Sequence, residues 1–258
     1  MTQYETITVA LDPRGVASLT LNRPDKRNAL SALMIEELTA AALTLGQSSA
    51  RAVVLSGAGP VFCAGADLDW MTAQIKADRA TRMTAARKLA VMLQTLNEMP
   101  KPLIGRLHGG AFGGGIGLAC VCDVAIAAPD TRFGLTETRL GLIPATISPY
   151  VLARIGEGAA RRIFMSARIF DADEARDLGL IGKVSTDPDI DTQAEVAPYL
   201  SVAPGAVAAA KGLTRRLGPR IDAQVIEDTI TSLADTWESE EAAHGIAAFL
   251  AKQPPRWA

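Results

Sequence analysis

Six of the ten residues from His108 to Gly117 are glycines, and an apolar run that ends at Asp123 follows them directly. Glycine in a helix interior costs about 1 kcal/mol relative to alanine, so a cluster this dense needs a reason. Three reasons are available: a loop that cradles phosphate, close packing of two backbone segments, or main-chain N–H groups directed at a ligand. All three require other atoms to approach this backbone closely.

The glycine spacing does not match the common phosphate-binding patterns. A dinucleotide fingerprint, G-x-G-x-x-G/A, would need a glycine or alanine at position 118 or 120, where Leu118 and Cys120 stand. No G-x-x-x-x-G-K sequence occurs in the chain, and neither does the G-x-S-x-G of serine hydrolases. These absences weaken the phosphate-cradle explanation and leave close packing or ligand-directed amides.

The N-terminal two thirds of the sequence alternate strand and helix patterns. Alternating apolar residues at 7, 9 and 11 and again at 16, 19 and 21, separated by the turn sequence Asp-Pro-Arg-Gly, predict a β-hairpin. Helical spacing over 28–46 predicts a helix that ends at Gly46. Buried strands are predicted within 51–57, 101–110 and 123–128. This alternation predicts an α/β domain.

Beyond about residue 150 the strand signals fade and helical patterns dominate. Asp171 and Ser239 stand where helix N-caps are expected. The polar segment Ser185–Gln193 is predicted to be an exposed connector. We therefore expect a core domain over residues 1–195 and a C-terminal helical region over 196–258.

Composition narrows the class of protein. The 258 residues are 48% hydrophobic, enough for one large core, and 26 basic against 28 acidic residues leave a net charge of −2 with no basic run for nucleic acid. No leader pattern and no apolar stretch of membrane-spanning length appear. Cys63, Cys120 and Cys122 lack metal-site spacing, so we expect reduced, buried thiols in a cytoplasmic protein without a membrane partner.

Two glycine-containing loops have the same local context. The segments 59–68 and 108–117 each follow an apolar strand and precede a helix, so each places free N–H groups at a helix N-terminus. Two such loops could direct their amides at one oxygen atom. That arrangement is an oxyanion hole, and small residues let the substrate carbonyl approach it closely.

Five segments carry a resemblance to a known family, in order and over almost the whole chain: NRPDKRNAL, FCAGADL, HGGAFGGGIGLACVCDVAIA, FGLTETRLGLIP and the terminal AAFLAK. Together they resemble the enoyl-CoA hydratase/isomerase, or crotonase, superfamily. The residue sequences of these motifs most closely resemble those of bacterial methylglutaconyl-CoA and isohexenylglutaconyl-CoA hydratases. The resemblance implies a spiral of ββα units with a C-terminal helical trimerisation region, a homotrimer or dimer of trimers, and an acyl-CoA thioester as substrate, with no other cofactor and no metal.

The resemblance also implies roles for particular residues. Ala66 and Gly114 would supply the two N–H donors to the thioester oxygen, and Glu137 would be the acid/base. Substrate or CoA contacts would come from Lys26, Arg27, Ala64, Gly65, Asp67, Leu68, Phe249 and Lys252, the last two reaching the CoA of a neighbouring subunit. Simpler interpretations exist beside these: helix N-terminal acid for Asp67, solvated surface for the basic residues, core aromatic for Phe249, and an ion pair with Arg139 for Glu137.

The sequence departs from the two-glutamate hydratases at one position. Their other glutamate stands three residues after the second N–H donor, where this chain has Gly117. Three hypotheses follow: a hydratase that uses Glu137 as its one carboxylate, a Δ3-Δ2 enoyl-CoA isomerase, or a non-catalytic acyl-CoA-binding protein. The apolar neighbours of Glu137 predict a raised pKa. An apolar ridge could line the acyl pocket: Leu142, Ile143, Pro144, Ile147 and Tyr150.

Overall fold

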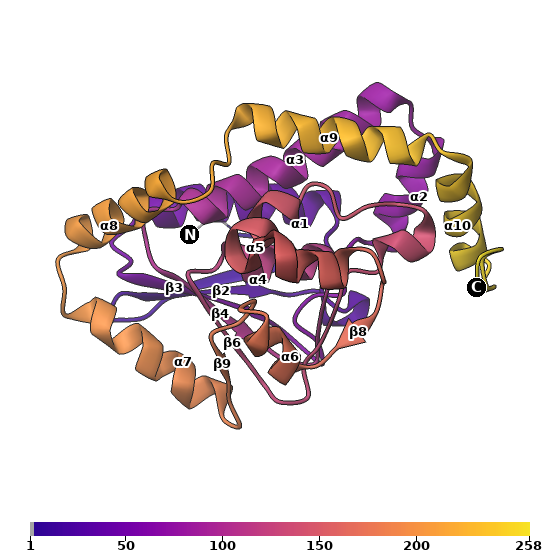
Figure 1. Cartoon of the computed structure of the whole chain (residues 1–258). Coiled ribbons are helices and arrows are strands. Elements are labelled where there is room, and N and C mark those ends of the chain that lie inside the picture. The colour runs from indigo at the N-terminus through magenta and orange to yellow at the C-terminus, as the bar shows by residue number, and fades with distance from the viewer. Residues whose placement is uncertain (1–2) are drawn as a thin grey trace.

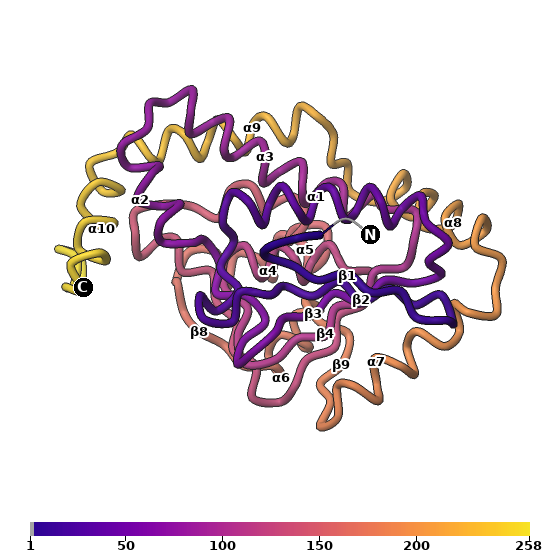
Figure 2. The backbone as a smooth tube through the Cα atoms, turned by 180° about the vertical axis from the view of Figure 1, so that it is seen from behind, coloured from indigo at the N-terminus to yellow at the C-terminus, as the bar shows by residue number. Residues whose placement is uncertain are grey.

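The computed structural model describes residues 3–258 and has a mixed α/β architecture (Figures 1 and 2). Its main sheet has six strands in the order β1-β2-β3-β4-β6-β9. Their bounds are Ile7–Leu11, Val16–Leu21, Ala52–Gly57, Leu103–Leu107, Val124–Ala127 and Lys183–Val184. The predicted hairpin is confirmed, because β1 pairs antiparallel with β2; all other pairs in this sheet are parallel.

A second, three-stranded sheet carries the end of the glycine-rich segment. Its order is β5-β7-β8, with bounds Gly110–Phe112, Arg132–Gly134 and Ile169–Phe170. Strand β5 follows β4 after two residues and leads directly into helix α4 (Gly114–Val121). Repeated strand–strand–helix units therefore wind from the main sheet into the smaller one, which confirms the predicted crotonase-type ββα spiral.

Alternate residues of the central strands face two different cores. Val53 and Leu55 of β3 belong to the large core, on the side of helices α1 (Ala32–Gln47) and α3 (Arg79–Glu98) (Figure 1). Val54 belongs to a smaller cluster with Val196, the last residue of helix α7 (Pro188–Val196). Such period-two burial on both faces is what a parallel sheet covered by helices requires.

The C-terminal helices lie along the outside of this core. Helix α9 (Ala223–Trp237) packs along α3, and α10 (Glu240–Leu250) follows it to the C-terminus (Figures 1 and 2). Helix α8 (Pro204–Leu217), at the opposite end of the molecule from α10, buries none of its residues. None of the helices in residues 3–258 is both long and apolar enough to cross a membrane.

Two details of the predicted elements are wrong. Helix α1 begins after Ser31, whose hydroxyl accepts the Met34 N–H, and it continues through Gly46 to Gln47. The predicted connector at 185–193 is largely helix α7, because Asp187 caps its N-terminus by accepting the Ile190 N–H and a proline occupies its first turn.

The predicted predominance of helix beyond residue 150 is confirmed, although the short strands β8 and β9 also lie there. Helix α5 (Ser148–Phe164) is kinked at Gly156, whose φ is 73°. The two predicted caps are confirmed: Asp171 accepts an N–H of α6 (Ala172–Asp177), and Ser239 accepts one of α10.

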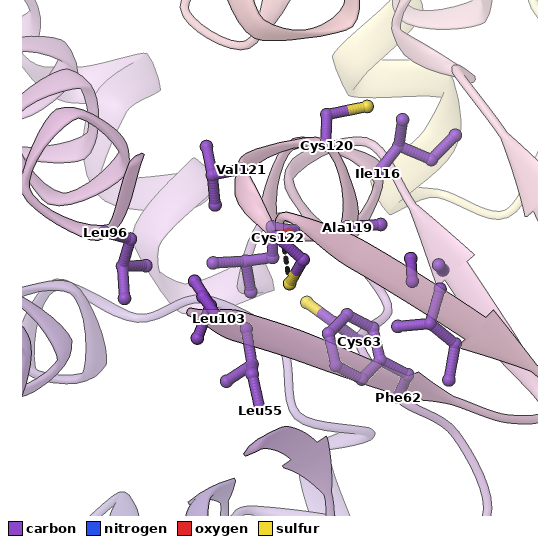
Figure 3. Packing of buried hydrophobic residues seen from close by; sticks show 14 of the residues in the cluster. Leu55, Phe62, Cys63, Leu96, Leu103, Ile116, Ala119, Cys120, Val121 and Cys122 are labelled. Atoms are coloured by element: carbon purple, nitrogen blue, oxygen red, sulfur yellow. Dashed lines mark hydrogen bonds between the residues drawn. The ribbon is translucent and has the colours of Figure 1, made fainter. Parts of the chain in front are cut away.

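The three cysteines are buried and unpaired, as predicted (Figure 3). Burial raises the pKa of each thiol to about 12, so all three are protonated at neutral pH. The Cys122 thiol donates to the Leu118 carbonyl oxygen. Figure 3 shows the Cys120 side chain projecting away from Cys122. These side chains therefore serve as small apolar core residues.

Candidate active site

Close packing explains the glycines of the segment 108–117. A Cβ atom added at any of its six glycines would lie within 2.9 Å of another heavy atom. At Gly115, for example, the Cβ would lie 2.7 Å from the Cys63 carbonyl oxygen. Gly109 and Gly115 therefore let the segment lie against the 59–68 loop, and the other glycines allow close contact with residues elsewhere.

The two glycine-containing loops are joined by backbone hydrogen bonds. The Cys63 N–H donates to the Gly110 carbonyl oxygen, and the Phe112 N–H donates to the Cys63 carbonyl oxygen, each at 3.0 Å. Gly65 has a φ of 93°, and a Cβ there would lie 2.9 Å from the Phe112 carbonyl oxygen. The two loops therefore lie side by side, and the convergence of their amides on one oxygen atom stays a prediction.

The Ala66 and Gly114 amides line one cavity. Its volume is about 310 Å³, and both residues belong to its wall, together with Gly65 and Gly113. Gly114 is the first residue of α4, where the N–H has no intrahelical acceptor. Within residues 3–258, neither the Ala66 N–H nor the Gly114 N–H donates a hydrogen bond. Two unused donors thus lie beside one space.

The Glu137 carboxyl lies at the same cavity, at the start of the one-turn 3-10 helix η2 (Glu137–Leu140). Its Oε1 lies 2.9 Å from where a Cβ on Gly113 would be. The residue as a whole is partly exposed, but Oε2 is buried and has no hydrogen-bond partner in the described chain. Burial raises the pKa of Glu137 to about 7. No ion pair joins it to Arg139 within residues 3–258.

Ile147 fills the space beside Gly117. A Cβ on Gly117 would lie 2.6 Å from Ile147 Cγ2 and 3.6 Å from Leu93 Cδ2. Ile147 precedes helix α5, is 2% exposed and lines the cavity. Ile147 therefore leaves no room for a side chain at position 117. Glu137 is the one carboxylate among the residues that line the cavity.

Gly117→Ala is expected to destabilise the fold by about 1–3 kcal/mol, because the new methyl group overlaps Ile147 Cγ2. Adding Ile147→Ala should recover part of that loss, since it removes the overlapping methyl group. Urea unfolding of the wild type, both single variants and the double variant measures this coupling. Additive effects of the two substitutions would contradict the contact.

Most of the cavity wall is apolar. Leu142, Ile143, Pro144 and Ile147 of the predicted ridge line it, joined by Trp70 and Trp237. Tyr150 is the exception, because it lines a separate groove beside α8 and not this cavity. The side chains with charged or hydroxyl groups in the wall are Thr136, Glu137, Arg139 and Thr146.

Asp67 has a structural role in the fold. It is 3% exposed, pairs with Arg23 at 2.9 Å, and caps α2 (Leu68–Lys76) by accepting the Asp69 and Trp70 N–H groups. Although burial disfavours its charge, these hydrogen bonds and Arg23 hold the pKa of Asp67 below its usual value. The helix-acid interpretation is confirmed, whereas Leu68 does line the cavity.

Of the other predicted contact residues, Phe249 lines the cavity and Lys26, Arg27, Ala64 and Lys252 do not. Phe249 of α10 lines it within its own chain, so reaching this cavity requires no neighbouring subunit. Lys26 is half-exposed and lies 3.7 Å from Asp69. Arg27, Ala64 and Lys252 are not among the lining residues. Their contacts to CoA stay predictions.

Comparison with known proteins identifies the family. The family model described as enoyl-CoA hydratase/isomerase matches residues 12–258. The chain belongs to the enoyl-CoA hydratase/isomerase family. The crotonase resemblance drawn from five sequence segments is thereby confirmed.

Two solved structures match nearly the full length of this chain, and a sequence relative matches most of it. An enoyl-CoA hydratase from Shewanella pealeana is 37% identical, with a TM-score of 0.82 over 99% of this chain and 97% of that one. Pseudomonas aeruginosa AtuE is 38% identical, with a TM-score of 0.77 over 98% and 100%. The enoyl-CoA hydratase AKT6-1 of Alternaria alternata is 33% identical over 210 residues, which are 80% of this chain and 68% of that protein.

Sequence reasoning missed several residues of this crotonase site. No motif in the sequence indicates that Trp70, Trp237 and Thr146 belong to the site. They come from separate segments, and only tertiary packing brings them to one cavity. Ile147 was predicted as a ridge residue, but its contact with Gly117 was not. A bulky residue facing a glycine across the core leaves no local pattern.

Proposed function

We propose that this protein adds water to an α,β-unsaturated acyl-CoA, with the Ala66 and Gly114 amides as oxyanion hole and Glu137 as its acid/base. One observation carries the proposal. Two residues with unused N–H donors and one carboxyl with a raised pKa line the same apolar cavity. The family membership and the hydratase names of its relatives support it.

The chemistry follows from these groups. Two N–H donors on the thioester oxygen stabilise the negative charge that develops when a nucleophile adds to the β carbon. Glu137, ionised, takes a proton from water as the new C–O bond forms, and the π electrons move to the enolate. The same carboxyl then gives its proton to the α carbon. Because one group handles both protons, water and hydrogen are expected to add to the same face of the double bond.

A second candidate function is Δ3-Δ2 enoyl-CoA isomerisation. The observation that favours it is the Gly117–Ile147 contact, which places a methyl group where a second carboxylate could have held water. Isomerisation needs one carboxyl that takes a proton from one carbon and returns it to another. Glu137 in an apolar wall meets that requirement.

Product analysis separates the candidates. The protein would be incubated with 3-methylglutaconyl-CoA, crotonyl-CoA and a 3-enoyl-CoA, and the products identified by mass. A gain of one water supports the hydratase, and double-bond migration without mass change supports the isomerase. Binding of all three thioesters without conversion would contradict both and indicate the non-catalytic acyl-CoA-binding alternative.

The rate is expected to depend on pH through Glu137. Its pKa of about 7 means that the ionised form needed as base is scarce below pH 6. We expect kcat/KM for water addition to rise with pH and to reach half its plateau near pH 7, because kcat/KM reports the free enzyme. A profile already flat from pH 5 to pH 8 would contradict the role of this carboxyl.

The proposal extends to assembly. Helix α8 buries none of its residues, although Leu213 and Leu217 are on it. A helix that exposes apolar residues in this way is typically covered by another chain. The expected homotrimer, or dimer of trimers, would supply that cover, and light scattering of the purified protein tests it.

A further inference from the structure

Thr146 carries a hydroxyl that the site described so far does not use. The residue is 6% exposed and lines the cavity. Its Oγ1 forms no hydrogen bond to any residue in the described part of the chain. The hydroxyl is not among the fully buried polar atoms that lack a partner within residues 3–258, so it is accessible to a water or a ligand.

The backbone around Thr146 is fixed. The Ala145 carbonyl oxygen accepts hydrogen bonds from the Ser148 N–H at 3.0 Å and the Ser148 hydroxyl at 2.6 Å. The Ile147 carbonyl oxygen accepts the Val151 N–H at 3.1 Å as helix α5 begins. Thr146 therefore lies in a hydrogen-bonded turn at the start of α5, which supports a group that positions a ligand.

The segment that holds Thr146 is also the one that fills the space beside Gly117. Ile147 excludes any carboxylate there, so a water that attacks the β carbon has only Glu137 as a charged acceptor. A confined water needs two to four polar partners. Among the side chains of the wall, apart from Glu137, Arg139 and the two tryptophans, the hydroxyls of Thr136 and Thr146 can bond such a water.

Thr146 is the better placed of the two hydroxyls. Thr136 is partly exposed and stands at the start of η2, whereas Thr146 is buried in the cavity wall. Arg139 is exposed and would leave a water bound to it open to solvent. The indole N–H groups can only donate, and so cannot accept a proton of the water.

We propose that the Thr146 hydroxyl is a positioning residue that holds the attacking water against the Glu137 carboxylate. This inference rests on the proposed hydratase function. One O–H of the water donates to Glu137 and the other to Thr146 Oγ1, which leaves an oxygen lone pair free for the β carbon. As the C–O bond forms, the proton on the Glu137 side moves to the carboxylate, and Glu137 later delivers it to the α carbon. The sum is addition of one water.

The test compares water addition with a reaction that needs no water nucleophile. Thr146→Val and Thr146→Ala remove the hydroxyl, and Thr146→Ser retains it. Thr192→Val, at a buried threonine of helix α7 that does not line the cavity, is the matched control. For each, kcat and KM for 3-methylglutaconyl-CoA and crotonyl-CoA would be measured. Hydrogen exchange at the α carbon of a saturated acyl-CoA in D₂O, which uses the amides and Glu137 alone, is followed in parallel.

We expect Thr146→Val and Thr146→Ala to lower kcat for water addition by about tenfold or more, since a water hydrogen bond is lost. KM and α-carbon exchange should stay within about twofold, and Thr146→Ser should restore hydration. Unchanged hydration in the Val and Ala variants, or an equal fall in hydration and exchange, would overturn the inference. Wild-type protein that exchanges α hydrogen but never adds water would instead refute the hydratase function on which it rests.

Discussion

Glu137→Gln is expected to abolish most of the turnover, with a fall in kcat of about 10²–10⁴-fold. Glutamine has the same shape and fits the same wall, but it can neither take a proton from water nor deliver one to carbon. The two amides remain, so the acyl-CoA should bind with a Kd close to that of the wild type. Steady-state kinetics with 3-methylglutaconyl-CoA and crotonyl-CoA, combined with isothermal titration of a saturated acyl-CoA, measure both quantities.

The stability of this variant provides an independent check. Burial raises the folded-state pKa of Glu137 to about 7 from its ordinary value of 4.5, so protonation stabilises the folded state. That contribution is fully present below about pH 4.5 and is lost as pH rises through about 7. We therefore expect the unfolding free energy of Glu137→Gln minus that of the wild type to increase from pH 5 to pH 8. A constant difference across that range would mean that the carboxyl is not held in an apolar environment.

The parts of the site that depend on the backbone could be predicted from the sequence. That two glycine-containing loops could present main-chain donors at helix N-termini follows from rules that act over a few residues, whereas Ala66 and Gly114 themselves are implied only by the family resemblance. The burial of Glu137 could be anticipated from its apolar neighbours. In each case the determining interaction is local, so a single sequence contains it.

The parts that depend on contact between distant segments could not be predicted. Nothing near Gly117 indicates that Ile147 occupies its side-chain space, thirty residues later in the chain. Helix α7 was missed for a different reason: its Asp-Pro start is both a turn signal and a helix N-terminus, and the burial of Val196 against the sheet decides between them.

Under the proposed hydratase function, the arrangement of Glu137 and Ile147 makes activation of the thioester by the Ala66 and Gly114 amides decisive. A single carboxyl with a pKa near 7 is a weak base, so it can act on water only when the thioester draws electrons strongly from the β carbon. That demand falls on the two main-chain donors. The loss of one donor should therefore be nearly as damaging as the loss of the carboxyl, although no side-chain function is removed.

Gly114→Pro is expected to lower kcat by about 10²–10³-fold relative to Gly114→Ala, because proline lacks the N–H that would donate to the thioester oxygen. Gly114 is the first residue of α4, the helix position at which proline is best tolerated. Both variants add a Cβ that meets the tip of Leu30, 2.6 Å from its Cδ1, so this packing change cancels in the comparison. Kinetics of the pair, with circular dichroism as the folding control, isolate the one hydrogen bond. Equal rates for the two folded variants would show that the Gly114 N–H does not donate to the thioester oxygen. The proposed oxyanion hole would then lose one of its two donors.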